Sequence, residues 1–123
     1  MKRAALLLLV ALFFGTIAAM AGPYNPVVDM TVTEPSGQTK TLSAPESGLA
    51  TINIANAEYG FRPTIMDSKP WMHVIVTIFK MGTSTDYTKQ IGEVDLKTGG
   101  PAVASKSTPI FKVAVTKVSP PAS

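Results

Sequence analysis

The stretch Trp71-Met-His-Val-Ile-Val-Thr-Ile-Phe-Lys-Met81 (WMHVIVTIFKM) is the most apolar run of the sequence outside its N-terminal segment. The even-numbered residues from Met72 to Ile78 are all apolar, and the odd-numbered residues from Trp71 to Phe79 are mostly apolar. Successive side chains of a strand point to opposite faces, so both faces of this run are apolar. Such a strand needs cover on both sides, by a loop, a terminal segment or a partner where the core does not supply it. The run therefore predicts the central strand of a sheet.

The sequence around this strand alternates apolar and polar residues, whereas nothing after residue 21 sustains the period of a helix. The segment 27–34 (VVDMTVTE) places Val28, Met30 and Val32 on one face, as in a strand with one wet side. Similar patterns predict strands at 38–42, 49–55, 58–66, 87–96 and 110–118. In two of them, the residues predicted to face inward are Ala50, Ile52, Ile54, Phe111, Val113 and Val115.

Short strands separated by turn signals over about 100 residues are typical of an all-β fold. We therefore expect a single antiparallel β-sandwich of about seven strands, immunoglobulin-like or C2-like. A small barrel is the alternative.

Proline and glycine mark where the strands are expected to be irregular. Pro63 has no N–H to donate, so its strand is expected at a sheet edge or broken by a bulge. Gly92 predicts a bulge or a close backbone approach. The segments 43–48 and 97–109 are predicted loops, the second with brief pairing at residues 102–104. Residues 119–123 form a predicted flexible tail.

The first 21 residues have the parts of a cleavable secretory signal. A cationic start, 1–3 (MKR), precedes an apolar run of about 16 residues that ends in 19–21 (AMA), a good signal-peptidase site. An uncleaved anchor is the alternative, but the run is shorter than the roughly 20 residues that span a bilayer. We expect residues 1–21 to be removed and residues 22–123 to form one exported domain. The lack of cysteine and of Asn-x-Ser/Thr triplets favours a bacterial periplasmic or secreted protein.

Cysteine and charge exclude several classes of function. The absence of cysteine excludes disulfides, a lipid-modified N-terminal cysteine and structural zinc. Of the 11 Lys and Arg residues, two lie in the signal segment, so 9 basic residues remain against 8 acidic ones. Arg62 is the only arginine among the 9, and no basic stripe is present, so nucleic-acid binding is not expected. We also expect no cofactor, and no membrane span once the signal is removed.

No motif predicts catalysis or a metal centre, so we expect a protein that is not an enzyme. A Ser-His-Asp triad would need His73, the only histidine, which lies within a predicted strand without a G-x-S-x-G elbow elsewhere. Copper could bind His73 with methionines such as Met72, but these two side chains point to opposite faces of a strand. Glu93 and Asp95, about 6.8 Å apart on one face, fit a glycosidase pair in spacing, yet such acids usually solubilise an outer face.

The opening stretch also holds the main candidates for a binding surface. Trp71, the only tryptophan, lies two residues before His73 at the head of the predicted strand, and Phe79 shares their face. If the fold covers these side chains they are core, and if it does not they form an aromatic patch of the kind that binds a partner. Three further residues can extend such a patch: Tyr59, Phe61 and Arg62.

These features favour an exported, non-enzymatic interaction or structural module of the bacterial envelope or exterior. Its partner would be another envelope or extracellular protein, or a glycan, and an open sheet edge or an exposed aromatic patch would support it. The alternative is a calcium- or carbohydrate-binding sandwich. In that case calcium would be held by Asp29, Glu93 and Asp95 on neighbouring outer faces, or a sugar would stack on an aromatic ring.

Overall fold

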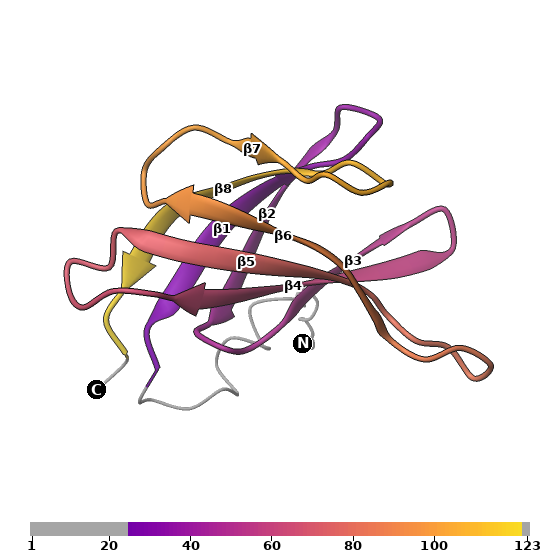
Figure 1. The fold of residues 1–123 in the computed structure, drawn as a ribbon, viewed down its shortest axis with the longest axis horizontal. Helices are drawn as coiled ribbons and strands as arrows, with labels where there is room; N and C mark the ends of the chain where they lie inside the picture. Colours follow the sequence, from indigo (N-terminus) through magenta and orange to yellow (C-terminus); the bar gives the residue numbers. More distant parts are fainter. Residues whose placement is uncertain (1–24, 122–123) are drawn as a thin grey trace, which may run out of the picture.

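The computed structural model describes residues 25–121, and these residues contain eight β-strands and no helix (Figure 1). The strands are β1 (Val27–Thr33), β2 (Thr39–Pro45), β3 (Ala50–Ile54), β4 (Ala57–Ile65), β5 (His73–Lys80), β6 (Lys89–Lys97), β7 (Val103–Ala104) and β8 (Lys112–Ser119). The all-β prediction is confirmed. The predicted signal segment 1–21 and the last two residues of the predicted tail lie outside the described residues.

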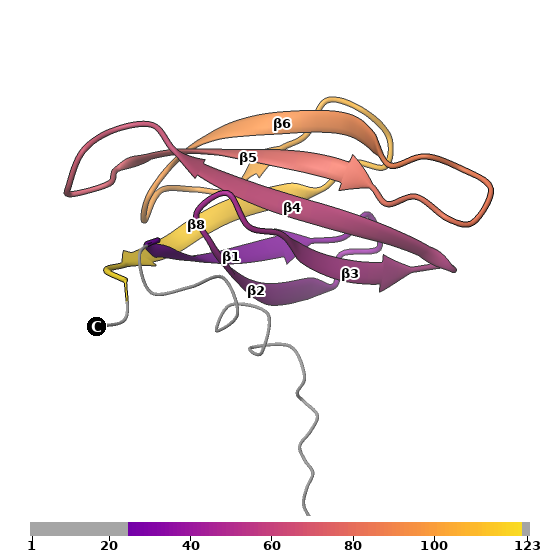
Figure 2. The ribbon, with the colours of Figure 1, turned by 90° about the horizontal axis from the view of Figure 1, so that it is seen from below.

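The strands form two antiparallel four-stranded sheets, one in the order β2-β1-β8-β7 and the other in the order β3-β4-β5-β6. Figure 2 shows the two sheets as two layers, and one apolar core lies between them. The buried core residues are Val28, Met30, Val32, Ala44, Ala50, Ile52, Phe61, Val74, Val76, Ile78, Val94, Leu96, Phe111, Val113 and Val115. The predicted inward faces are therefore confirmed, with Ile54 only partly buried. This arrangement is compatible with a sandwich, since the described strands form two separate sheets.

β5 lies inside its sheet between β4 and β6, as its two apolar faces predicted. Val74, Val76 and Ile78 on its inner face are fully buried. Its outer face is only half-buried and is shielded by side chains of the same sheet: the Arg62 guanidinium lies 4.8 Å from the centre of the Phe79 ring. In the described residues, the cover seen on this face is the Arg62 side chain over Phe79, from the neighbouring strand of the same sheet.

The prediction that the strand around Pro63 is an edge strand or bulged is wrong. β4 is internal, and its register with β5 runs without a break from Tyr59 to Ile65. β3 accommodates Pro63 because its first residue, Ala50, lies opposite Phe61. The proline nitrogen therefore lies beyond the part of β4 that pairs with β3. The Pro63 carbonyl points the same way and accepts the Ser47 N–H at 2.8 Å. The missing N–H of Pro63 costs little stability, because no residue of β3 lies opposite it to accept a hydrogen bond.

Of three further local predictions, the bulge at Gly92 and the pairing near residue 103 are confirmed, and the loop at 43–48 is partly wrong. The bulge expected at Gly92 is present, since Ile78 lies opposite Gly92 and Phe79 opposite Gln90, which leaves Ile91 as the extra residue. The predicted pairing near residue 103 occurs as β7. The predicted loop at 43–48 is wrong in its first half, because β2 continues in register with β1 as far as Pro45.

Candidate functional site

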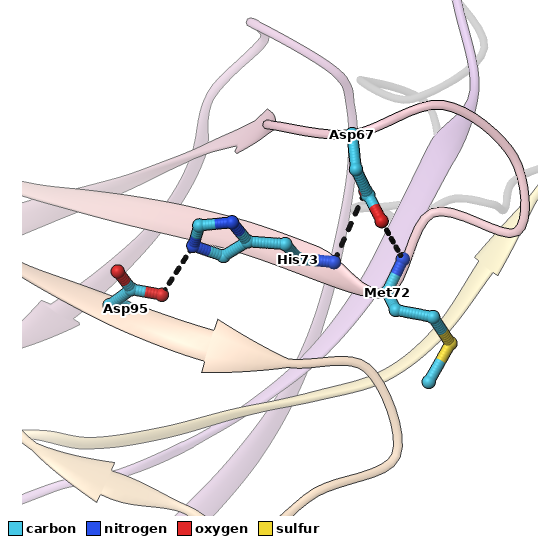
Figure 3. Close-up of polar contacts among 4 residues, drawn as sticks. All are labelled: Asp67, Met72, His73 and Asp95. Atoms are coloured by element: carbon cyan, nitrogen blue, oxygen red, sulfur yellow. Dashed lines mark hydrogen bonds and ion pairs between the residues drawn. The ribbon is translucent and has the colours of Figure 1, made fainter.

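The connection between β4 and β5, residues 66–72, is held in one conformation by its own hydrogen bonds; it is called the β4–β5 loop below. The Asp67 carboxylate accepts the backbone N–H groups of Met72 at 2.9 Å and of His73 at 3.2 Å (Figure 3). The Met66 N–H in turn donates to the His73 carbonyl at 2.9 Å. These bonds close the loop at its base, so its outer side chains project from a fixed backbone.

Trp71 lies in this loop and not in β5, and its backbone adopts the left-handed conformation, with φ 55°. A bulky residue in this region is unusual and stores about 1–3 kcal/mol of strain. Hydrogen bonds on both sides of Trp71 maintain it: its N–H donates to the Ser68 carbonyl at 3.0 Å, and its carbonyl accepts the Thr98 hydroxyl at 2.7 Å. The indole is half-buried, with the Lys69 ammonium 5.3 Å from the ring centre.

The same loop carries two exposed methionines. Met66 is 51% exposed and Met72 is 37% exposed, at the two ends of the β4–β5 loop. Met66, Trp71 and Met72 together are called the apolar tip below. Exposed apolar side chains mark an interaction surface where they gather into a patch, and this loop carries two of them beside the tryptophan in the chain. The apolar tip is therefore the candidate binding site of the described residues.

His73 and Asp95 form a polar pair beside the loop, on the outer face of the sheet (Figure 3). His73 Nε2 lies 2.6 Å from Asp95 Oδ1, and the two side chains are 46% and 69% exposed. Figure 3 also shows the Met72 side chain directed away from the His73 ring. An open hollow of about 400 Å³ adjoins the pair and is lined by Met72, His73, Asp95, Leu96 and Lys97.

This polar pair has a limited chemical repertoire. A histidine bonded to a carboxylate is the base and orienting half of a catalytic triad, but within residues 25–121 no hydroxyl is hydrogen-bonded to His73. Met72 is directed away from the ring, so the two do not form a copper site. In the described part of the chain, no group of three or more His, Cys, Asp or Glu residues could hold a metal ion. The pair is best described as a surface contact between β5 and β6.

We expect the His73–Asp95 pair to contribute little to stability. Replacing His73 with Gln, or Asp95 with Asn, should change the free energy of unfolding by less than about 1 kcal/mol, because both side chains are exposed and solvent weakens the contact between them. Urea unfolding followed by Trp71 fluorescence measures this change. A loss of several kcal/mol in both variants would show that the pair holds the β4–β5 loop in place.

The six residues predicted as binding candidates do not form one surface. Trp71 and His73 lie together at the start of β5, while Phe79 lies six residues further along, about 20 Å away at the rise of an extended strand. Arg62 contacts Phe79 at that far end. The remaining two candidates face the core next to Phe111, at ring-centre distances of 5.2 Å for Tyr59 and 5.3 Å for Phe61.

The calcium ligands considered from the sequence are not neighbours. Asp29 lies in β1, whereas Glu93 and Asp95 lie in β6 of the other sheet. Asp29 accepts the Ser43 hydroxyl at 2.8 Å, and Asp95 is bonded to His73. The expectation that these acids share neighbouring outer faces is wrong, because β1 and β6 belong to different sheets.

Three residues that shape the site were not predicted from the sequence: Asp67, Thr98 and Met66. The sequence signal for Asp67 is its place at the head of a turn-forming stretch, Asp67-Ser-Lys-Pro, because an aspartate that starts a turn often accepts nearby backbone N–H groups. Thr98 is 27 residues from Trp71 in the chain, and no local pattern connects them. Met66 is the last residue of the predicted strand 58–66, and strand alternation alone gives no reason to expect it in a loop.

The chain matches no protein-family model, no curated protein and no solved structure. Across residues 25–121, the structure contains no helix with the length and apolar character needed to cross a membrane.

Proposed function

We propose that this protein is an exported, non-enzymatic β-sandwich module, immunoglobulin-like or C2-like in architecture, that binds a partner through the apolar tip of its β4–β5 loop. The observation that carries the proposal is the backbone of Trp71, which is held in a left-handed conformation by the Ser68 and Thr98 hydrogen bonds. Strain of this kind persists where the surrounding structure imposes it, and it gathers at ligand-binding positions.

The energetics of the loop support a binding role. Met66 and Met72 leave apolar surface in water, which does nothing for the stability of the isolated chain. Because Asp67 and Thr98 already order the loop backbone, docking would lose little further conformational entropy. Tryptophan is also among the residues that most often dominate binding energy at interfaces.

The signal pattern supports export, and the exposed position of His73 supports a non-enzymatic role. The signal pattern of residues 1–21 supports export to the bacterial periplasm or exterior, where the partner would be another envelope or extracellular protein. The only histidine of the sequence lies on an exposed sheet face beside an open hollow, which supports a role other than catalysis.

The single tryptophan makes the proposal testable by fluorescence. Iodide should quench Trp71 in the purified protein, and an envelope or culture-fluid fraction of the producing bacterium should protect it. Met66→Gln and Met72→Gln should weaken that protection at least about tenfold, since each removes apolar contact area at the tip. Tyr87→Ser is the matched control, because Tyr87 is 91% exposed but lies in the β5–β6 connection. Protection that is equal in all three variants, or absent in the native protein, contradicts the proposal.

Carbohydrate binding is a second candidate, favoured by the partly exposed indole of Trp71 with the polar Lys69 beside it. Sugars stack on aromatic rings while their hydroxyls bond to nearby polar groups. Titration with oligosaccharides, followed by the same fluorescence, separates this candidate from a protein partner. A calcium titration with a thermal-shift readout tests the remaining alternative.

A further inference from the structure

Four strands form the edges of the two sheets, and three of them carry features that oppose pairing with another strand. β2 carries Lys40, whose ammonium is turned inward to lie 3.2 Å from the Glu34 carboxylate. β6 contains the bulge at Ile91, and β7 consists of only two residues. An inward-pointing charge, a bulge and a very short strand are all features that keep sheet edges from associating.

β3 is the fourth edge strand, and it has none of these features. Its residues Ala50–Ile54 (ATINI) carry no charge and no proline, and its register with β4 is unbroken. On its other side, no strand of residues 25–121 pairs with it. β3 is thus a regular, uncharged and open edge.

The turn that follows β3 determines which of its backbone groups face this open edge. Ala55 and Asn56 both have positive φ, 50° and 68°, as in the two-residue turn of a tight hairpin, so Ile54 and Ala57 exchange hydrogen bonds. Because bonded and non-bonded pairs alternate along an antiparallel ladder, Thr51 and Asn53 direct their N–H and C=O groups away from β4.

The neighbouring strand confirms this alternation. Glu58, which lies opposite Asn53, directs its carbonyl to the β5 side, where it accepts the Met81 N–H at 2.8 Å. Pro63, of the other parity, directs its carbonyl to the β3 side. The outward groups of β3 are therefore those of Thr51 and Asn53.

We propose that β3 pairs antiparallel with β3 of a second copy of this chain, about a two-fold axis at Ile52. In this register Thr51 lies opposite Asn53 of the second copy, so the outward-facing groups of these two residues exchange backbone hydrogen bonds. The two sheets then join into one continuous sheet across the dimer.

The side chains of β3 suit this register. Ala50 lies opposite Ile54 of the second copy, so a small residue meets a large one, and Ile52 meets its own equivalent on the same face. On the outer face the Thr51 hydroxyl meets the Asn53 amide, two groups that hydrogen-bond to each other across strands. An identical partner satisfies all these pairs at once, and this self-complementarity favours a second copy over an unrelated peptide.

The oligomeric state tests the proposal. The protein, expressed with its own N-terminal segment and purified as the cell processes it, should approach twice the mass of one chain in sedimentation equilibrium. A concentration series from about 1 μM to 1 mM covers the range expected of one strand pair. Asn53→Pro should remain a monomer throughout, because it removes an outward N–H without touching the bonds to β4.

A proline on another edge provides the matched control. The Glu34 N–H donates to the Gln38 carbonyl at 2.8 Å, and the same alternation then turns the Thr41 N–H of β2 toward its open edge. Thr41→Pro should therefore leave the dimer intact. A protein that is monomeric over the whole series, or a dimer that Asn53→Pro leaves unchanged, overturns the proposal.

Amide hydrogen exchange provides a readout that needs no variant. In the monomer the Thr51 and Asn53 amides face solvent and should exchange quickly, while the Ile52 amide is bonded to β4 and should exchange slowly. At high concentration the first two should slow at least tenfold and Ile52 should change little. Equal exchange of Thr51 and Asn53 at both ends of the series contradicts pairing at this edge.

Discussion

Phe61→Ala is expected to lower the free energy of unfolding by about 3–5 kcal/mol, which is the usual range for deleting a buried aromatic ring. Phe61 is fully buried, and its ring packs edge-to-face on Phe111 at a centre distance of 5.3 Å. The contact joins the two layers, because Phe61 belongs to β4 and Phe111 directly precedes β8. A domain of this size has a total stability of about 5–15 kcal/mol, so the loss would be a large part of it. Urea unfolding followed by far-UV circular dichroism measures the change.

Phe79→Ala is the matched control for this substitution. Phe79 is the same residue type on the neighbouring strand, but it lies on the half-buried outer face, where its main contact is the Arg62 guanidinium. Its removal should lower the free energy of unfolding by only about 1 kcal/mol. Equal losses for the two variants would show that the space between the sheets is not the core that holds the layers together.

Lys40→Met is expected to lower the free energy of unfolding by about 2 kcal/mol, although it replaces a charged residue with an apolar one. The Glu34 side chain is only 6% exposed, and the Lys40 ammonium lies 3.2 Å from its Oε2 atom. Apart from this ion pair, that oxygen makes no hydrogen bond within the described residues, so removal of Lys40 leaves a buried carboxylate oxygen without compensation. The loss stays below the 3–5 kcal/mol typical of fully buried pairs because Lys40 is itself about one-third exposed, and solvent screens it.

The double variant Glu34→Met with Lys40→Met separates charge burial from packing. It removes both charges, so its stability should return to within about 1 kcal/mol of the native protein. Urea unfolding of the native protein, both single variants and the double variant completes the thermodynamic cycle. A double variant no more stable than Lys40→Met alone would show that the lysine stem, and not its charge, supports the end of β2.

Much of the fold could be predicted because one physical rule, the two-residue alternation of a strand, acts locally. Val28, Met30 and Val32 are buried where the pattern placed them, as are Phe111 and Val113. The central position of β5 followed from the apolar character of both its faces. The prediction at Pro63 was wrong although its physical premise holds. Proline does exclude a ladder bond at that point, but no residue of β3 lies opposite it, so β4 can still be an internal strand.

The candidate site could be predicted only in part. Trp71 and His73 lie at the start of β5, as their place in the sequence predicted, but Phe79, which was expected to share their face, and Tyr59 and Phe61 do not lie beside them. Tyr59 and Phe61 face the core because of the alternation along β4. Phe79 lies near the far end of β5. The bonds from Thr98 to the β4–β5 loop join segments distant in the chain, so no local pattern contained them.

By itself, the sequence determined the class of this protein: an all-β chain with alternating strands, no cysteine and a nearly balanced charge after the predicted signal. Alternation and composition are properties of neighbouring residues, and they can be interpreted without knowing what packs against them. Only the tertiary structure decided which edge is open, which aromatic side chains reach solvent and why Trp71 holds a strained backbone. Those features depend on which strands become neighbours, and strand order is set by the summed packing of the whole core and not by any single segment.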